Sequence, residues 1–162
     1  MRKTNIIEML QNSINKELNK VKTLQVRITY DNALMQQVKK SKRKEWTGCN
    51  NNGDINEYLT IEMVFNDINH LKDNIQGVDY TDQNGDTYEI KLLAKSSPHT
   101  YKAVADYVLI TILQNELKKL NLPFGVYKIH KNDIKHLEGK RFNWTMLEPL
   151  IKSKKLTLIY KW

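Results

Sequence analysis

The sequence predicts an α/β protein of the α+β kind, in which helices flank a mixed central β-sheet. Three observations lead to this prediction. Apolar residues recur at helical spacing in some segments and alternate with polar residues in others, which indicates both helices and strands. Residues 77–91 hold a turn signal between two strand-like runs. The chain of 162 residues is 40% hydrophobic and 27% charged, a composition typical of a folded domain with one core.

The N-terminal part is expected to form a helical arm. Helical spacing of apolar residues predicts an amphipathic helix at 6–21, and alternation predicts a short strand at 24–30. A second helix is expected from residue 33 into a basic run. We expect this arm, residues 1–45, to pack on a core formed by residues 46–162 and to contribute to dimerisation.

The core is expected to begin with a helix. Asp54 with Glu57 forms a capping-box-like start, which predicts a helix from Asp54 to about residue 69. Glu62 is the notable polar residue on or near the apolar face of this helix, and a solvated position is its simplest interpretation.

The remaining elements of the core follow from apolar runs and breakers. The most apolar segment, 103–120, is predicted to be a helix that Thr100 can cap. This helix would connect strands at 87–94 and 124–129, which would then pair in parallel. A helix near 144–152 and a strand at 156–160 complete the fold.

Residues 77–91 carry the strongest chemical signal. Glu89 and Lys91 share one face of the predicted second strand because side chains alternate along a strand. A two-residue loop at 84–85 would turn Asp79 away from them. We favour a three-residue loop, 83–85, with Gly85 in the left-handed conformation. In that register the opposed pairs are Asp82 and Asp86, Asp79 and Glu89, and Gly77 and Lys91.

Two carboxylates and a lysine on one face suit phosphodiester hydrolysis with a metal ion. Asp79 and Glu89 supply the oxygen ligands that Mg²⁺ prefers, and Lys91 can orient or deprotonate a water. Most acidic pairs near a lysine on a hairpin are solvated surface charges. Here the strand at 87–94 is apolar enough to be buried, and buried charges need partners or a metal.

The charge of the chain favours a polyanionic partner. Lysine and arginine number 26 against 18 aspartate and glutamate residues, which gives a net charge of +8. Two simpler interpretations stay open. The protein is basic without a polyanionic partner, or the loop after the hairpin is an ordinary connection between elements. The residues expected to contact DNA are a basic cluster and the loop that follows the hairpin, which is placed to read base edges: Lys42, Arg43, Lys44, Lys95, Ser96, Ser97, His99, Thr100, Tyr101 and Lys102.

The hairpin segment resembles the active-site segment of type II restriction endonucleases in the PD-(D/E)xK nuclease superfamily. The matching pattern is Gly77-x-Asp79-x-x-Asp82-x-x-Gly85-x-x-Tyr88-Glu89-Ile90-Lys91. This resemblance implies a restriction-endonuclease-like core, the backbone carbonyl of Ile90 as a further metal ligand, and products with 5′-phosphate and 3′-hydroxyl ends. It also makes Glu62, on the helix before the hairpin, a candidate accessory acid for the metal site. Val78 stands where the superfamily usually has proline, and a histidine-rich recognition segment is reduced to His99. The recognised DNA sequence is therefore not implied.

The sequence thus favours a Mg²⁺-dependent type II restriction endonuclease that acts on double-stranded DNA as a homodimer. A structure-selective nuclease, such as a junction resolvase or repair nickase, uses the same chemistry and stays open. So does a non-catalytic basic DNA-binding protein. The single cysteine, Cys49, excludes an intramolecular disulfide framework. No apolar run approaches membrane-spanning length, so a cytoplasmic protein is expected.

Overall fold

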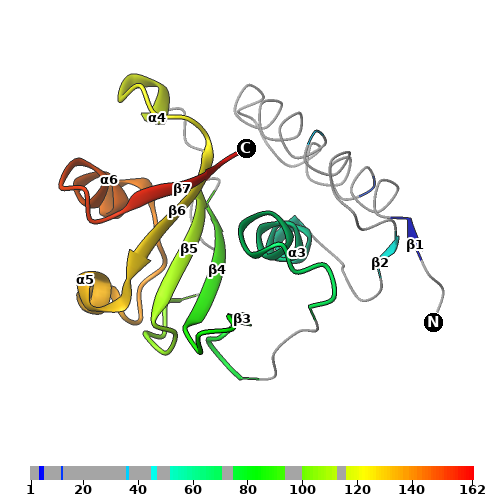
Figure 1. The fold of residues 1–162 in the computed structure, drawn as a ribbon. Helices are drawn as coiled ribbons and strands as arrows, with labels where there is room; N and C mark the ends of the chain where they lie inside the picture. The colour runs from blue at the N-terminus through cyan, green and yellow to red at the C-terminus, as the bar shows by residue number, and fades with distance from the viewer. Residues whose placement is uncertain are drawn as a thin grey trace. The chain divides into compact units, whose positions relative to one another are not determined.

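The computed structural model of the protein describes residues 4–5, 12, 36, 45–46, 52–70, 75–93, 100–112 and 116–162 (Figure 1). The chain divides into two compact units, residues 1–70 with Trp162 and residues 71–161. Most of the predicted arm, residues 1–45, lies outside the described residues, so its boundary with the core stays a prediction. Asn12 and Gln36 are described, and both are helical. Within the described ranges, no helix has the length and apolar composition needed to cross a membrane.

The first unit contains a short ladder and one long described helix. β1 (Thr4–Asn5) pairs antiparallel with β2 (Glu45–Trp46). Helix α3 (Asn52–Phe65) begins before the predicted start, so Asp54 lies in its first turn, where a negative charge is favoured. The helix ends before residue 69 because Asn66 adopts a φ of 55°, a conformation that terminates helices.

Glu62 on α3 is buried, with 5% of its surface exposed. The expectation that Glu62 is a solvated side chain is therefore wrong. A buried carboxylate needs hydrogen-bonding or charged partners. Glu62 and the hairpin belong to different units, so its role as an accessory acid stays a prediction.

The second unit is built on a five-stranded mixed sheet in the order β3-β4-β5-β6-β7. β4 and β5 are parallel, and every other neighbouring pair is antiparallel. The predicted α+β class, with a mixed sheet and flanking helices, is confirmed. The strands are β3 (Tyr80–Thr81), β4 (Thr87–Leu93), β5 (Tyr107–Ile112), β6 (Gly125–His130) and β7 (Thr157–Lys161).

The most apolar segment forms a strand, so the predicted helix at 103–120 is wrong. No helix begins at Thr100, and β5 occupies residues 107–112. Its sequence, YVLITI, is rich in β-branched residues that favour strands, and burial of both faces removes the alternation that marks a strand. Among the described residues between β5 and β6, a short helix, α4 (Glu116–Lys119), is present. The parallel pair is therefore β4 with β5, and the predicted parallel pairing of β4 with β6 is wrong.

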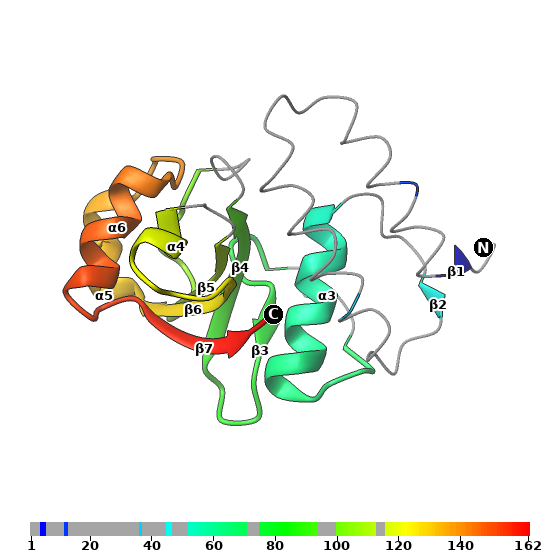
Figure 2. The same cartoon turned by 90° about the horizontal axis from the view of Figure 1, so that it is seen from above.

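One face of the sheet carries the hydrophobic core of this unit. Helices α5 (Lys131–Ile134) and α6 (Trp144–Lys152) lie on the same side of the sheet in both views (Figures 1 and 2). A 3-10 helix, η1 (Lys135–Leu137), connects to α5. α6 has the predicted bounds, and the side chain of Asn143 accepts a hydrogen bond from the backbone of Met146 at its start. The core residues from these elements are Val108, Ile110, Ile112, Tyr127, Ile129, Ile134, Leu137, Leu147 and Leu150.

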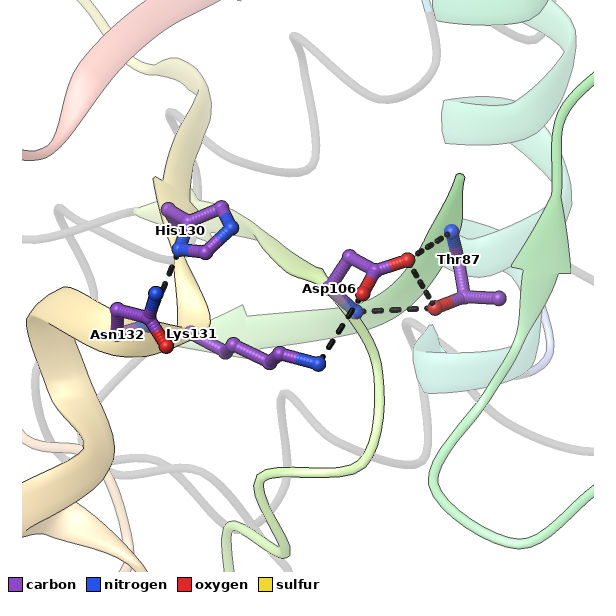
Figure 3. A network of polar contacts seen from close by, with 5 residues as sticks. All are labelled: Thr87, Asp106, His130, Lys131 and Asn132. Atoms are coloured by element: carbon purple, nitrogen blue, oxygen red, sulfur yellow. Dashed lines mark hydrogen bonds and ion pairs between the residues drawn. The ribbon is translucent and has the colours of Figure 1, made fainter. Parts of the chain in front are cut away.

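Asp106 joins the beginnings of β4, β5 and α5 (Figure 3). Its Oδ2 accepts hydrogen bonds from the backbone N–H and the hydroxyl of Thr87, at 3.1 and 2.9 Å. Its Oδ1 pairs with Lys131 Nζ at 3.1 Å. His130 begins α5 by accepting the backbone N–H of Asn132 at its Nδ1, 3.1 Å away. The backbone bond from Thr87, followed by the bond from Lys131, holds the pKa of Asp106 below its ordinary value.

We predict that Asp106→Asn lowers the urea midpoint of unfolding at pH 7. Because the folded-state pKa is lowered, the carboxylate stabilises the fold above its ordinary pKa, and this contribution is lost as the pH falls through the lowered value. The difference between wild type and variant should therefore shrink at a pH below the ordinary carboxyl value of 3.8, where the lowered pKa is reached. Urea unfolding followed by circular dichroism at both pH values measures it. A control, Asp133→Asn, loses only a 3.7 Å surface ion pair with Lys155 and should change the midpoint less.

Candidate metal centre

A tight turn sets the register of the β3–β4 hairpin. The backbone N–H of Gly85 donates to the carbonyl of Asp82 at 3.0 Å, and that of Asp82 donates to the carbonyl of Asp86 at 3.0 Å. Gly85 has a φ of 86°, which favours glycine. The predicted three-residue loop, 83–85, is confirmed, together with the pairing of Asp82 and Asp86.

The side chain of Asp82 fastens this turn to the strand. Its Oδ1 accepts the backbone N–H groups of Asn84 and Asp86 at 2.9 and 3.0 Å. Its Oδ2 accepts the hydroxyl of Tyr88 at 3.0 Å. Burial, and next the bond with Asp82, raises the pKa of Tyr88. Asp82 thus has a structural role in the hairpin.

Asp79 lies at the end of the ladder, directly beside β4. Its backbone N–H donates to the carbonyl of Tyr88 at 2.8 Å, and its Oδ2 accepts the backbone N–H of Ile90 at 2.7 Å. Ladder pairing stops at Tyr80, so Asp79 and Glu89 are not a ladder pair. The carboxylate of Asp79 is still close enough for its charge to raise the pKa of Glu89. The two acids therefore interact electrostatically, and their facing position on the hairpin stays a prediction.

The predicted position of Gly77 across from Lys91 is wrong. Gly77 lies in a turn outside the ladder, with a φ of 84°. A Cβ atom added to Gly77 would meet Val104 Cβ at 3.1 Å. Gly77 therefore allows the turn to approach the segment before β5 closely.

Glu89 and Lys91 form a buried ion pair on β4. Lys91 Nζ lies 2.8 Å from Glu89 Oε1. The exposed fraction is 8% for the side chain of Lys91 and 10% for that of Glu89. Their ladder partners on β5 are Val108 and Ile110, so the pair lies on the core-bearing face of the sheet. Burial raises the pKa of Glu89, and the charge of Lys91 opposes that shift.

The donor set fits a hard divalent cation with oxygen ligands. Glu89 Oε2 is buried and accepts no hydrogen bond from the residues that the structure describes. Asp79 supplies a second carboxylate, which is bonded to the backbone N–H of the next residue on β4, Ile90. Across the described ranges, no three His, Cys, Asp or Glu side chains gather around one point. Mg²⁺ suits such a site because it is commonly held by one or two carboxylates together with waters and substrate phosphates. The carbonyl of Ile90 as a further ligand stays a prediction.

Two aromatic side chains that the sequence did not indicate border the ion pair. Lys91 Nζ lies 5.8 Å from the ring centroid of Phe142, and the rings of Phe142 and Tyr101 are 5.3 Å apart. Tyr101 was expected to contact DNA, but only 1% of its surface is exposed, so we no longer expect this contact. In the sequence, Phe142 differs from its neighbours only as a single large apolar residue within a polar segment.

The other residues expected to contact DNA divide into two groups. Thr100 and Lys102 are exposed, and the positive charge of Lys102 acts to lower the pKa of Glu89. The remaining expected contacts lie outside the described residues and stay predictions: Lys42, Arg43, Lys44, Lys95, Ser96, Ser97 and His99.

Comparisons of the chain with protein-family models, with curated proteins and with solved structures found no match. The function is therefore argued from the residues and geometry of the hairpin.

We predict that Gly85→Ala destabilises the protein by about 1 kcal/mol, because alanine is strained in the left-handed conformation. No atom lies within 4 Å of an added Cβ, so backbone strain accounts for the whole effect. Gly85→Asn should destabilise less because asparagine tolerates this conformation. Urea unfolding of the three proteins measures the order, and equal stability of the alanine variant and wild type would contradict it.

We predict that Lys91→Met destabilises the fold by about 3 to 5 kcal/mol at neutral pH, because it leaves the buried Glu89 carboxylate without its partner. The double variant Glu89→Leu/Lys91→Met should recover most of this loss, since an apolar pair of similar volume commonly replaces a buried ion pair without penalty. Equilibrium unfolding in urea measures both. If the double variant is as unstable as the single one, the pair has a structural role that apolar packing does not replace.

Proposed function

We propose that the protein is a Mg²⁺-dependent endodeoxyribonuclease of the PD-(D/E)xK kind, a type II restriction endonuclease that cleaves double-stranded DNA at a short specific site. The observation that carries the proposal is the hairpin itself, where Asp79 is bonded to the backbone of β4 beside the buried Glu89–Lys91 pair. The net charge of +8 supports a polyanionic substrate.

The fold supports this proposal through the placement of the hairpin. β3 and β4 form one edge of a mixed sheet, and α5 and α6 lie over the face that carries Glu89 and Lys91. We propose that this unit is a restriction-endonuclease-like core. Residues 1–45 are proposed to contribute to a homodimer, because cleavage of both strands at a palindrome needs two sites related by a two-fold axis.

The chain's own residues divide the chemistry between them. Asp79 and Glu89 would hold Mg²⁺, which supplies positive charge to stabilise the phosphate during in-line attack by water. Lys91 Nζ, only 2.8 Å from Glu89 Oε1, is within reach of any water that contacts this carboxylate. Lys91 would orient that water through its ammonium group, and only a Lys91 amine that had first lost its own proton to solvent would accept the proton of the water. The exposed side chain of Lys102, whose charge acts to lower the pKa of Glu89, is suited to bind a DNA phosphate.

The substrate form distinguishes this proposal from its two rivals. Incubation of the purified protein with Mg²⁺ and phage DNA should give discrete fragments, and sequencing their ends identifies the site and the stagger. Cleavage of branched DNA alone would favour a structure-selective nuclease. Binding without cleavage of any DNA would favour a non-catalytic DNA-binding protein.

We predict that Asp79→Ala and Lys91→Ala each lower the cleavage rate by at least about 100-fold, since each removes a group that acts on the reacting phosphate or water. DNA binding, measured by mobility shift without Mg²⁺, should remain detectable. As matched controls, Glu148→Ala and Lys152→Ala break a surface ion pair on α6 that also measures 2.8 Å, and they should cleave normally. Full activity of either hairpin variant would contradict the mechanism.

A further inference from the structure

Tyr101 is held rigidly beside the Glu89–Lys91 pair. Its backbone N–H donates to the carbonyl of Lys140 at 2.9 Å, and its carbonyl accepts the N–H of Gly139 at 2.8 Å. Its ring packs against Phe142, with centroids 5.3 Å apart, and Phe142 also contacts Lys91. The side chain therefore has a fixed position in the core, although it follows directly after the exposed Thr100.

The hydroxyl of Tyr101 is buried and has no hydrogen-bond partner in the part of the chain that is described. A buried polar group without a partner is costly and rare. Tyr127, which is equally buried in the same core, shows the usual arrangement, because its hydroxyl donates to the carbonyl of Pro123 at 2.8 Å. The hydroxyl of Tyr101 thus differs from its counterpart in the same cluster.

The second unpaired oxygen on this face belongs to Glu89. The ladder partner of Glu89 is Val108, which lies in the same core cluster as Tyr101. Glu89 Oε2 is buried and accepts no hydrogen bond from the described residues. The hydroxyl of Tyr101 likewise has no hydrogen-bond partner among them. Packed side chains link the two groups, because the ring of Phe142 lies 5.3 Å from that of Tyr101 and 5.8 Å from Lys91 Nζ, which pairs with Glu89 Oε1. Burial, and next the charge of Glu89, raises the pKa of Tyr101 to about 12. Tyr101 is therefore a neutral donor at physiological pH.

We infer that Tyr101 is a positioning residue for Glu89, and that its hydroxyl and Glu89 Oε2 share one bound water. The hydroxyl donates to the water oxygen, and the water donates to the carboxylate, which accepts only. One water then satisfies both buried atoms, which is the usual solution for polar atoms enclosed in a core. The carboxylate would be held by Lys91 at Oε1 and by the water at Oε2.

The consequence for metal binding rests on the proposed function. A carboxylate that is oriented on both oxygens presents a fixed ligand to Mg²⁺, whereas one held by Lys91 alone is free to turn. Groups that orient a metal ligand in this way commonly raise the affinity for the metal by about 10- to 100-fold. Tyr101 acts here through Glu89 and has no contact with DNA.

The water is tested directly by high-resolution crystal structures of the metal-free wild-type protein and of Tyr101→Phe. We expect a water within hydrogen-bond distance of both oxygens in the wild type and its loss in the variant, with the ring and Glu89 in place. Absence of a bridging water in the wild type would overturn the inference. This result does not depend on any nuclease activity, so it separates the inference from the proposed function.

The effect on Mg²⁺ is tested by calorimetric titration of wild type, Tyr101→Phe and the matched control Tyr127→Phe. Tyr101→Phe should bind Mg²⁺ about 10 to 100 times more weakly without a lower melting temperature. Tyr127→Phe loses its bond to Pro123, so it should melt earlier and bind Mg²⁺ normally. Unchanged Mg²⁺ affinity in Tyr101→Phe would overturn the inference.

The same titration separates the two proposals. Weaker Mg²⁺ binding in Tyr101→Phe, in a protein that cleaves no DNA, would support the positioning role and contradict the nuclease. If the wild type binds no Mg²⁺, the metal site fails, and the water in the crystal structures alone decides the role of Tyr101.

Discussion

The buried ion pair between Lys91 and Glu89 is the interaction around which the bonds of the hairpin are arranged. Two opposite charges lie on a strand whose other residues are apolar, and both side chains are almost fully buried. An apolar pair would give similar stability, so stability alone does not explain the presence of these charges. The surrounding structure holds them in place: Asp82 fastens the turn, Asp79 bonds to the backbone of Ile90, and Asp106 fixes the start of β4. The proposed metal site would explain why these charges are present.

Local chemistry made the hairpin predictable from the sequence. Glycine at residue 85 supplies the positive φ that a three-residue loop requires, and the register of the ladder follows from that loop. The helix at 144–152 and the strands β4, β6 and β7 were also predicted, because their apolar patterns are bounded by polar residues or breakers. In each of these cases the deciding contacts are close in sequence.

Features that depend on distant contacts were not predictable in this way. The segment 107–112 was expected to be helical because its two faces are both buried, so its sequence has no alternation. Tyr101 was expected at a DNA groove, yet backbone bonds to Gly139 and Lys140 draw it into the core. Phe142 borders Lys91 from a loop after η1, and nothing near β4 in the sequence indicates that contact. The turn at Gly77 packs on Val104 for the same reason.

We propose above all that Asp79 and Glu89 together bind a divalent cation beside Lys91. Anomalous diffraction from crystals soaked in Mn²⁺, which has a similar preference for oxygen ligands, tests it most directly. We expect an anomalous peak in direct contact with one carboxylate oxygen of Asp79 and one of Glu89. Crystals of protein that is active with Mn²⁺, but whose only anomalous peaks lie away from Asp79 and Glu89, would contradict it.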